Sequence, residues 1–159
     1  MTDQTAEKLI EQVLGKFVHQ LFPSLVHPGF LGCPTECWGT FLRSLEKAVT
    51  ERGVEMEVVD LRPAPAEALN EVTARITASN RRRGEPLTHR TLLVLLGFDL
   101  LEGHEREGPI YPFRSEFQFD ERHIWLFMGQ DRSRLARLFH NRKLPLYLAA
   151  QDLTPPEWR

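Results

Sequence analysis

An unbroken apolar strand, Thr91–Leu96, constrains the fold of this chain more than any other feature of its sequence. A continuous apolar run of this kind is typical of a central parallel strand that is covered on both faces. A second run of the same character, His123–Met128, ends at Gly129. Because parallel strands are joined by crossover connections, usually helices, the two runs predict an α/β fold with helices on both faces of the sheet.

The remaining segments supply the other strands and helices of such a fold. Apolar residues at helical spacing predict one helix from Thr5 to Leu21 and another that begins at Thr35 as its N-cap and ends near Gly53. Further elements are expected at residues 24–31 (strand), 54–61 (strand), 65–78 (helix), 131–141 (helix) and 144–149 (strand). The prediction is one three-layer domain over residues 1–159: a mostly parallel sheet flanked by helices, with an N-terminal amphipathic helix within residues 1–22, a long loop at 102–122 and a tail at 154–159.

Size and charge narrow the class of protein. A chain of 159 residues fits one domain, and 42% apolar with 26% charged residues is the composition of a globular protein. The net charge of −2 provides no overall attraction to nucleic acid or to an anionic membrane. No apolar run approaches the ~20 residues of a membrane span. Two cysteines and a polar start, Met1–Gln4, lead us to expect a cytoplasmic protein without a signal peptide.

Residues Gly29–Leu42 form a turn-rich segment that runs into a helix, the place where a nucleotide-binding P-loop would lie. Such a loop reads G-x-x-x-x-G-K-[ST]: the second glycine lets the backbone wrap the phosphates, the lysine reaches the terminal phosphates and the hydroxyl binds magnesium. Counted from Gly32, these three positions hold Cys37, Trp38 and Gly39. The frame of a nucleotide loop is present, and its chemical groups are missing.

The strand that would carry the acid for magnesium is altered as well. In P-loop enzymes an acidic residue ends this strand, whereas here Leu96 and Gly97 stand at that place and Asp99 follows further on. Asp99 therefore has two interpretations, a turn residue or helix cap beyond the strand, or a displaced magnesium ligand.

The cysteines and histidines do not form a recognisable metal or catalytic motif. Cys33 and Cys37 are spaced C-x-x-x-C, but a structural zinc site takes four nitrogen or sulfur ligands, and only His27 lies near them in the sequence. His104 stands among glutamates in a segment that we interpret as a solvated acidic loop. We therefore predict no catalytic residue, no metal and no cofactor.

Aromatic and basic segments are the candidate contact surfaces. The long loop interleaves Tyr111, Phe113, Phe117 and Phe119, and the tail carries Trp158. These residues form a partner-binding surface, or they pack the loop and the tail onto their own domain. The basic run Arg81, Arg82 and Arg83 is either a solvated connection or a contact to a phosphate backbone.

The order of elements resembles that of a P-loop NTPase core of the AAA or STAND kind over about residues 29–153. Gly32 and Thr35–Leu42 stand at the Walker A position, Leu92–Asp99 at the Walker B position and Ile124–Gln130 at the sensor strand. The chain also resembles the BrxB component of the BREX anti-phage systems, in its amphipathic N-terminal helix, degenerate loop and buried strand Leu92–Gly97. That second resemblance implies a scaffold that binds larger enzymes.

These observations together predict a non-catalytic scaffold or adaptor subunit with a degenerate nucleotide-binding fold. It would bind a larger protein partner, such as an ATPase or a nuclease, and no membrane; anti-phage defence is the setting that the BrxB resemblance implies. The alternative is a protein that binds nucleotide or nucleic acid through displaced residues. Lys47, the arginines 81–83 or Arg132 would then replace the lysine, and Asp99 would hold the magnesium.

Overall fold

The structure, a computed structural model, is built on a parallel sheet. It describes residues 7–13, 15, 28–82, 84–85, 90–104 and 108–159, and everything below concerns those residues. The strands are β1 (Gly29–Gly32), β2 (Glu55–Asp60), β3 (Thr91–Leu96), β4 (His123–Gly129) and β5 (Gln151–Asp152). They pair in the order β2-β3-β4-β1-β5, and every pair is parallel.

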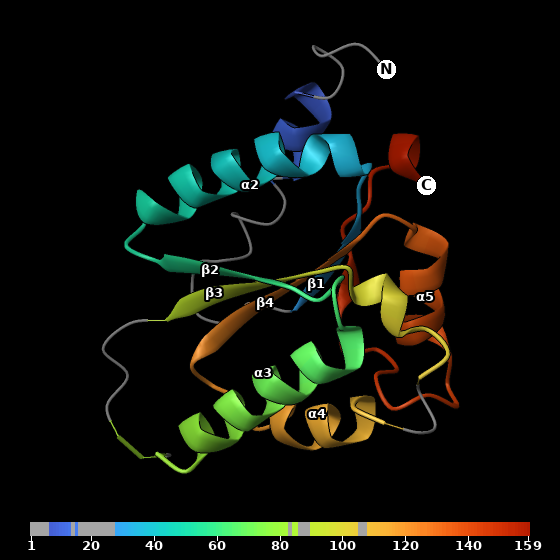
Figure 1. Ribbon diagram of the computed structural model, residues 1–159. Coiled ribbons are helices and arrows are strands. Elements are labelled where there is room, and N and C mark those ends of the chain that lie inside the picture. The colour runs from blue at the N-terminus through green and yellow to red at the C-terminus, as the bar shows by residue number, and fades with distance from the viewer. Residues whose placement is uncertain (1–6, 14, 16–27, 83, 86–89, 105–107) are drawn as a thin grey trace.

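Helices cover both faces of this sheet. They are α2 (Thr35–Thr50), α3 (Pro65–Asn80), α4 (Ile110–Phe117) and α5 (Arg132–His140), with two 3₁₀ turns, η1 (Phe98–Leu101) and η2 (Pro156–Trp158). Residues 7–13 and 15 are helical too. Figure 1 shows that helix beside α2 on one side of the sheet, and α3, α4 and α5 on the other. The predicted three-layer α/β architecture is confirmed.

The two central strands divide the interior into two cores. Leu92, Val94 and Leu96 of β3 pack with α2 and the N-terminal helical residues, whereas Leu93 and Leu95 pack with α3, α4 and α5. This division follows from the strand period of two, which sends successive side chains to opposite faces. The second core is rich in aromatic rings, and Phe127 of β4 has contacts with five of them: Phe98, Phe113, Phe117, Trp125 and Phe139.

The segment expected to be a long loop at 102–122 contains a helix. Ile110, Phe113 and Phe117 recur at helical spacing and place α4 against the second core. Prolines at 109 and 112 suggested a loop, but proline is tolerated in the first turn of a helix, where its missing N–H has no intrahelical acceptor. The structure thus shortens the irregular part of this connection.

The predicted last strand is wrong in position. Residues 144–149 form turns, and β5 follows them at Gln151–Asp152. The apolar residues of this segment suggested a strand, but Pro145 lacks a backbone donor and Leu148 has a left-handed φ of 59°, which breaks an extended ladder.

Other boundaries move by a few residues. Pro34 is the N-cap of α2, so Thr35 is its first helical residue and makes no side-chain cap. Gly53 does end that helix region, with a φ of 75°. The first strand begins at Gly29, and its expected residues 24–27 lie outside the described ranges, as do Leu14, Phe17 and Leu21 of the N-terminal helix.

Candidate functional site

The carboxyl edge of the sheet has a topological switch between β1 and β4. The chain leaves β1 for α2 on one face of the sheet and leaves β4 for α5 on the opposite face. Since β1 and β4 are neighbours, the two connections diverge, and in open α/β sheets ligands bind in the crevice formed at such a point. We take this edge as the candidate site.

The connection from β1 to α2 is only two residues long, Cys33 and Pro34. The Cys33 N–H donates to the Gly129 carbonyl at 2.9 Å, so the loop continues the ladder between β1 and β4 instead of curving away. Trp38 folds back over the loop and donates from Nε1 to the Cys33 carbonyl at 2.7 Å. Because Pro34 has no N–H, the single amide of this connection is engaged within the fold.

The residues at the three key positions of the nucleotide motif lie within α2. Cys37 and Trp38 are buried in the first core, and Gly39 is exposed on the outer side of the helix. A phosphate-binding lysine and hydroxyl would have to face the crevice, whereas the side chain of Trp38 packs inward. Burial, together with the charges of Cys37 and Glu36, raises the pKa of the Cys33 thiol, so this cysteine stays protonated and unreactive.

The crevice itself is filled by two other segments of the chain. The Gly32 N–H donates to Thr154 Oγ1 at 2.9 Å, across a sequence separation of 122 residues. The backbone of Arg132 lies against the same glycine: a Cβ on Gly32 would stand 2.7 Å from the Arg132 Cα and 2.9 Å from its N. The start of α5 and the segment after β5 therefore close over the end of β1.

An ion pair holds these two segments together. The Arg132 guanidinium donates to Asp152 Oδ2 at 2.9 and 2.6 Å, and Arg159 approaches the same oxygen at 3.7 Å. Burial alone would raise the pKa of Asp152, but hydrogen bonds from Thr154 and Arg132 outweigh it and hold that pKa below 3.8. Asp152 is therefore a carboxylate at neutral pH, and the arginine at the crevice is already neutralised.

Asp99 lies at the same edge, within η1. Its Oδ2 accepts the Asp131 N–H at 3.1 Å, which joins η1 to the N-cap of α5, and Asp131 in turn accepts from Ser133 and Arg134. The carboxylate packs so closely on Gly129 that a Cβ there would stand 2.5 Å from Asp99 Oδ1. Burial raises the pKa of Asp99 above 3.8, although the Asp131 N–H and the charge of Arg134 act against that shift.

The substitution Asp99→Asn is expected to flatten the pH dependence of stability. A carboxyl whose pKa is raised on folding binds its proton more tightly in the folded state, so the free energy of unfolding falls as pH rises from 3.8 through the folded-state pKa. Asparagine keeps an oxygen for the Asp131 N–H and removes the charge. Urea unfolding of both proteins across this range should show an advantage of the variant that is largest at neutral pH and shrinks on acidification. A constant difference would contradict the expectation.

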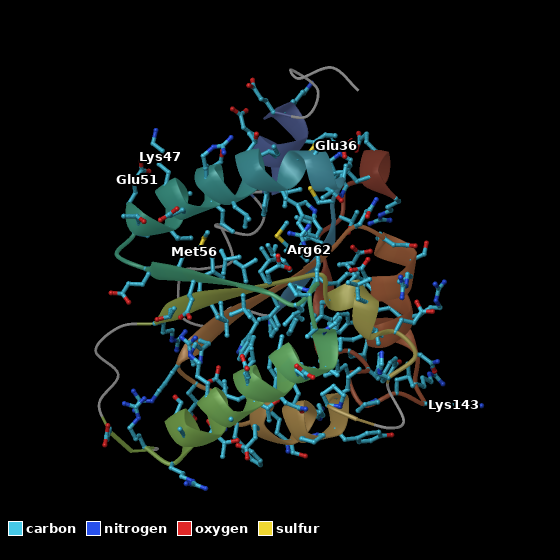
Figure 2. All side chains as sticks on the ribbon, in the orientation of Figure 1. Glu36, Lys47, Glu51, Met56, Arg62 and Lys143 are labelled. Carbon is cyan, nitrogen blue, oxygen red and sulfur yellow. The ribbon has the colours of Figure 1, made fainter. Side chains whose placement is uncertain are left out.

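The structure separates the residues proposed to replace the missing lysine. Lys47 lies in the last turn of α2, away from the crevice (Figure 2), and Arg81 and Arg82 follow α3, also away from the carboxyl edge. Arg83 lies outside the described residues. Only Arg132 is at the crevice, where Asp152 binds it.

Sequence reasoning missed Arg62, which does lie at this edge. Its guanidinium carbon stands 4.9 Å from the centre of the Trp38 ring, and the side chain forms a two-point ion pair with Asp60. Figure 2 shows it between α2 and the sheet. A positive charge over the indole stabilises the pair, so Arg62 covers the outer side of Trp38. No local motif marks this arginine, because Trp38, the ring that it covers, lies 24 residues earlier in the chain.

The predicted aromatic surface is only partly at the surface. Phe113 is fully buried, Phe117 is half-buried, and both pack on Trp125 in the second core. Trp158 is buried against the first core. Tyr111 and Phe119 are the members that remain exposed, at 49% and 46%. Two further exposed residues, Tyr147 and Leu148, were assigned to a strand from the sequence and so were not considered.

No group of three or more histidine, cysteine or acidic side chains capable of holding a metal occurs among the described residues. In the same part of the chain, every helix is too short or too polar to cross a membrane.

Comparisons with known proteins identify the fold alone. No family model matches the sequence, and no curated protein matches it. The structure is similar to that of the Aeropyrum pernix ORC1 protein in complex with DNA, with a TM-score of 0.64 and 13% identity. It is also similar to Drosophila ORC bound to DNA, with a TM-score of 0.51 and 12% identity.

These matches cover 94% and 96% of this chain, which spans 44% and 42% of the two solved chains. They support the P-loop-NTPase-like fold predicted from the sequence.

Proposed function

We propose that this protein is a non-catalytic adaptor: a domain with the fold of a nucleotide-binding protein that binds a larger enzyme and does not use nucleotide. The observation that carries the proposal is the closed crevice at the end of β1. Thr154 takes the Gly32 amide, and the main chain of Arg132 lies against Gly32. A phosphate group at that point would overlap atoms of the chain itself.

The chemistry of the crevice agrees with its geometry. A phosphate-binding loop presents several unpaired backbone N–H groups together with a cation. Here the N–H groups of Gly32 and Cys33 already donate to Thr154 and Gly129, and the Arg132 guanidinium is bound to Asp152. Phosphate binding through these groups would require breaking these contacts first, and each of them lies in the interior or at its margin. The fold therefore supports a binding role that is independent of nucleotide.

The partner is proposed from the resemblance to BrxB. That resemblance implies an adaptor that acts in anti-phage defence and binds an ATPase, a nuclease or a similar enzyme of such a system. A stable complex with an enzyme encoded beside it is the expected result of co-expression and size-exclusion chromatography. If the two proteins always elute apart, the proposed enzyme partner is wrong. The proposal that the fold acts without nucleotide is not affected by that result.

A second candidate is a nucleic-acid-binding adaptor. It is favoured by Arg81 and Arg82, which are exposed after α3, and by the two similar structures, both of which hold DNA. Binding through such arginines would weaken steeply as salt rises, because it depends on the release of counterions from the phosphates. Titration of a labelled duplex at two salt concentrations distinguishes the two candidates: the adaptor proposed above shows no salt-dependent binding.

Magnesium ATP is expected to leave the thermal stability of the protein unchanged. A ligand that binds only the folded state adds about 2.7 kcal/mol to the free energy of unfolding at a concentration a hundredfold above its dissociation constant. A thermal-shift series, checked by calorimetric titration, measures this directly. The matched control in the same series is Thr154→Val, which removes the hydroxyl that accepts the Gly32 N–H and so leaves that N–H without this acceptor. A clear shift in the unmodified protein would show that the crevice opens, and the nucleotide-binding alternative would replace the adaptor.

A further inference from the structure

We propose that the exposed face formed by Tyr111, Tyr147 and Leu148 is the docking surface of this protein, and that it binds an acidic amphipathic segment of a protein partner. The three residues are called the Leu148 surface below. The proposal deepens the adaptor function and rests on it, since it names the surface and the chemistry of the partner.

Leu148 is the most unusual residue of the described chain. It is the non-glycine residue with a positive φ, 59°, and its side chain is 69% exposed, the largest value among the exposed large apolar residues described. Left-handed backbone is unfavourable for leucine, and glycine or asparagine adopts it at lower cost. The conformation is held by the Leu148 N–H, which donates to the Phe139 carbonyl at 2.8 Å. The backbone at Leu148 is therefore strained, although its apolar side chain is not buried.

Tyr111 and Tyr147 extend the exposed apolar area around Leu148. Arg114 of α4 donates from Nε to the Pro145 carbonyl at 3.1 Å, which ties the turns after α5 to α4 (Figure 1). Tyr111 lies one helical turn before Arg114, on the same face of α4. Its ring is 49% exposed, and that of Tyr147 is 37% exposed. Exposed tyrosines beside an apolar anchor are the composition of protein-binding surfaces.

The segments that carry the Leu148 surface are rich in cations. Residues 132–150 contain four arginines and one lysine and no aspartate or glutamate, and α4 contains one arginine, Arg114, and one acid, Glu116. Glu102 pairs with Arg134 and Arg137, and Asp152 pairs with Arg132. Among the described residues no ion pair reaches Arg142 or Lys143, both of which are exposed, and Figure 2 shows Lys143 directed away from the fold.

This charge decides the class of partner. In a chain with a net charge of −2, an apolar surface with a positive rim complements a segment that carries carboxylates beside an apolar residue. The phosphates of a nucleic acid would pair with the same cations, but the Leu148 side chain would then have no apolar contact. The apolar centre therefore favours a protein segment, in which a leucine or phenylalanine meets Leu148 and acids meet Arg142 and Lys143.

The test uses the full chain and three labelled probes in fluorescence anisotropy. The first is a helical peptide of about 14 residues with leucine and phenylalanine on one face and glutamate on the other. The second has lysine in place of each glutamate, and the third is a single-stranded oligonucleotide of similar length. We expect the acidic peptide to bind at least about tenfold more tightly than the basic one, which corresponds to about 1.4 kcal/mol.

The decisive variant is Leu148→Asn, which suits the left-handed backbone and removes the apolar side chain. The variant should keep or raise the melting temperature of the protein, and it should weaken the binding of the acidic peptide about tenfold. The matched control is Val58→Thr, which alters an exposed apolar residue on the edge strand β2 and should leave binding unchanged. The double variant Arg142→Glu, Lys143→Glu should reverse the preference between the two peptides.

Three outcomes would overturn the proposal: equal binding of the two peptides, binding unaffected by Leu148→Asn, or an oligonucleotide that displaces the acidic peptide and binds more tightly. The last would assign the surface to nucleic acid. None of them depends on nucleotide binding. A failure of the Leu148 surface therefore leaves the magnesium ATP result standing, and a protein that binds ATP could still prefer the acidic peptide.

Discussion

Replacement of Phe127 by alanine is expected to lower the free energy of unfolding by about 3–5 kcal/mol. Phe127 is fully buried at the centre of the second core. Its ring centre lies 4.6 Å from that of Phe98 and 5.2 Å from that of Phe139, distances at which aromatic pairs attract beyond simple burial. The surrounding residues belong to β4, η1, α4 and α5, so they cannot collapse into the space together, and a cavity remains.

Urea denaturation measures this loss as a lower midpoint with an unchanged slope. Since single domains are stable by only about 5–15 kcal/mol, the variant would stand close to unfolding. Phe119→Ala is the matched control, because it removes the same atoms from a ring that is 46% exposed, and it should cost far less. Similar losses in both variants would mean that the aromatic cluster does not organise this side of the sheet.

The sheet was predictable because its strongest strands are marked by local pattern. Thr91–Leu96 and His123–Met128 are continuous apolar runs, and a run that is apolar on both faces fits only a strand covered on both sides. Both form the centre of the sheet, as β3 and β4. The helices α2 and α3 were equally visible, since their apolar residues recur at helical spacing.

The misassigned segments are those where local and tertiary signals disagree. Residues 144–149 have the apolar character of a strand, yet the Leu148 N–H is taken by the Phe139 carbonyl and the segment turns back on α5. The prolines around α4 concealed a helix that burial of Phe113 stabilises. In both cases contacts with other elements outweigh the propensity of the segment itself.

The candidate site shows the same limit more sharply. The sequence alone predicts that the lysine and the hydroxyl of a nucleotide loop are lacking, because Trp38 and Gly39 stand at the positions that the motif gives to them. The closure of the crevice is not visible, because it depends on Thr154 meeting Gly32 across 122 residues. A pattern of short range can show which chemical groups are lacking, and only the folded chain shows what occupies their place.

Gly32→Ala is expected to lower the free energy of unfolding by about 1–3 kcal/mol or more, the cost of forcing a methyl group into a packed interior. The new Cβ would meet the Arg132 Cα at 2.7 Å and its N at 2.9 Å, and these are backbone atoms that cannot rotate away. The start of α5 would have to move, although Asp99 and Asp152 both hold it.

Gly39→Ala is the matched control with the opposite sign. Its Cβ would have Arg43 Nη1 at 3.5 Å, an ordinary contact, and alanine within a helix is more stable than glycine by roughly 0.5–1 kcal/mol. Thermal and urea unfolding of the two variants measure the effect of the same added methyl group at two positions, the exposed Gly39 and the packed Gly32. A small cost at Gly32 would mean that the start of α5 moves away easily. The crevice could then open to a phosphate, and the case for a nucleotide-independent adaptor would lose its main support.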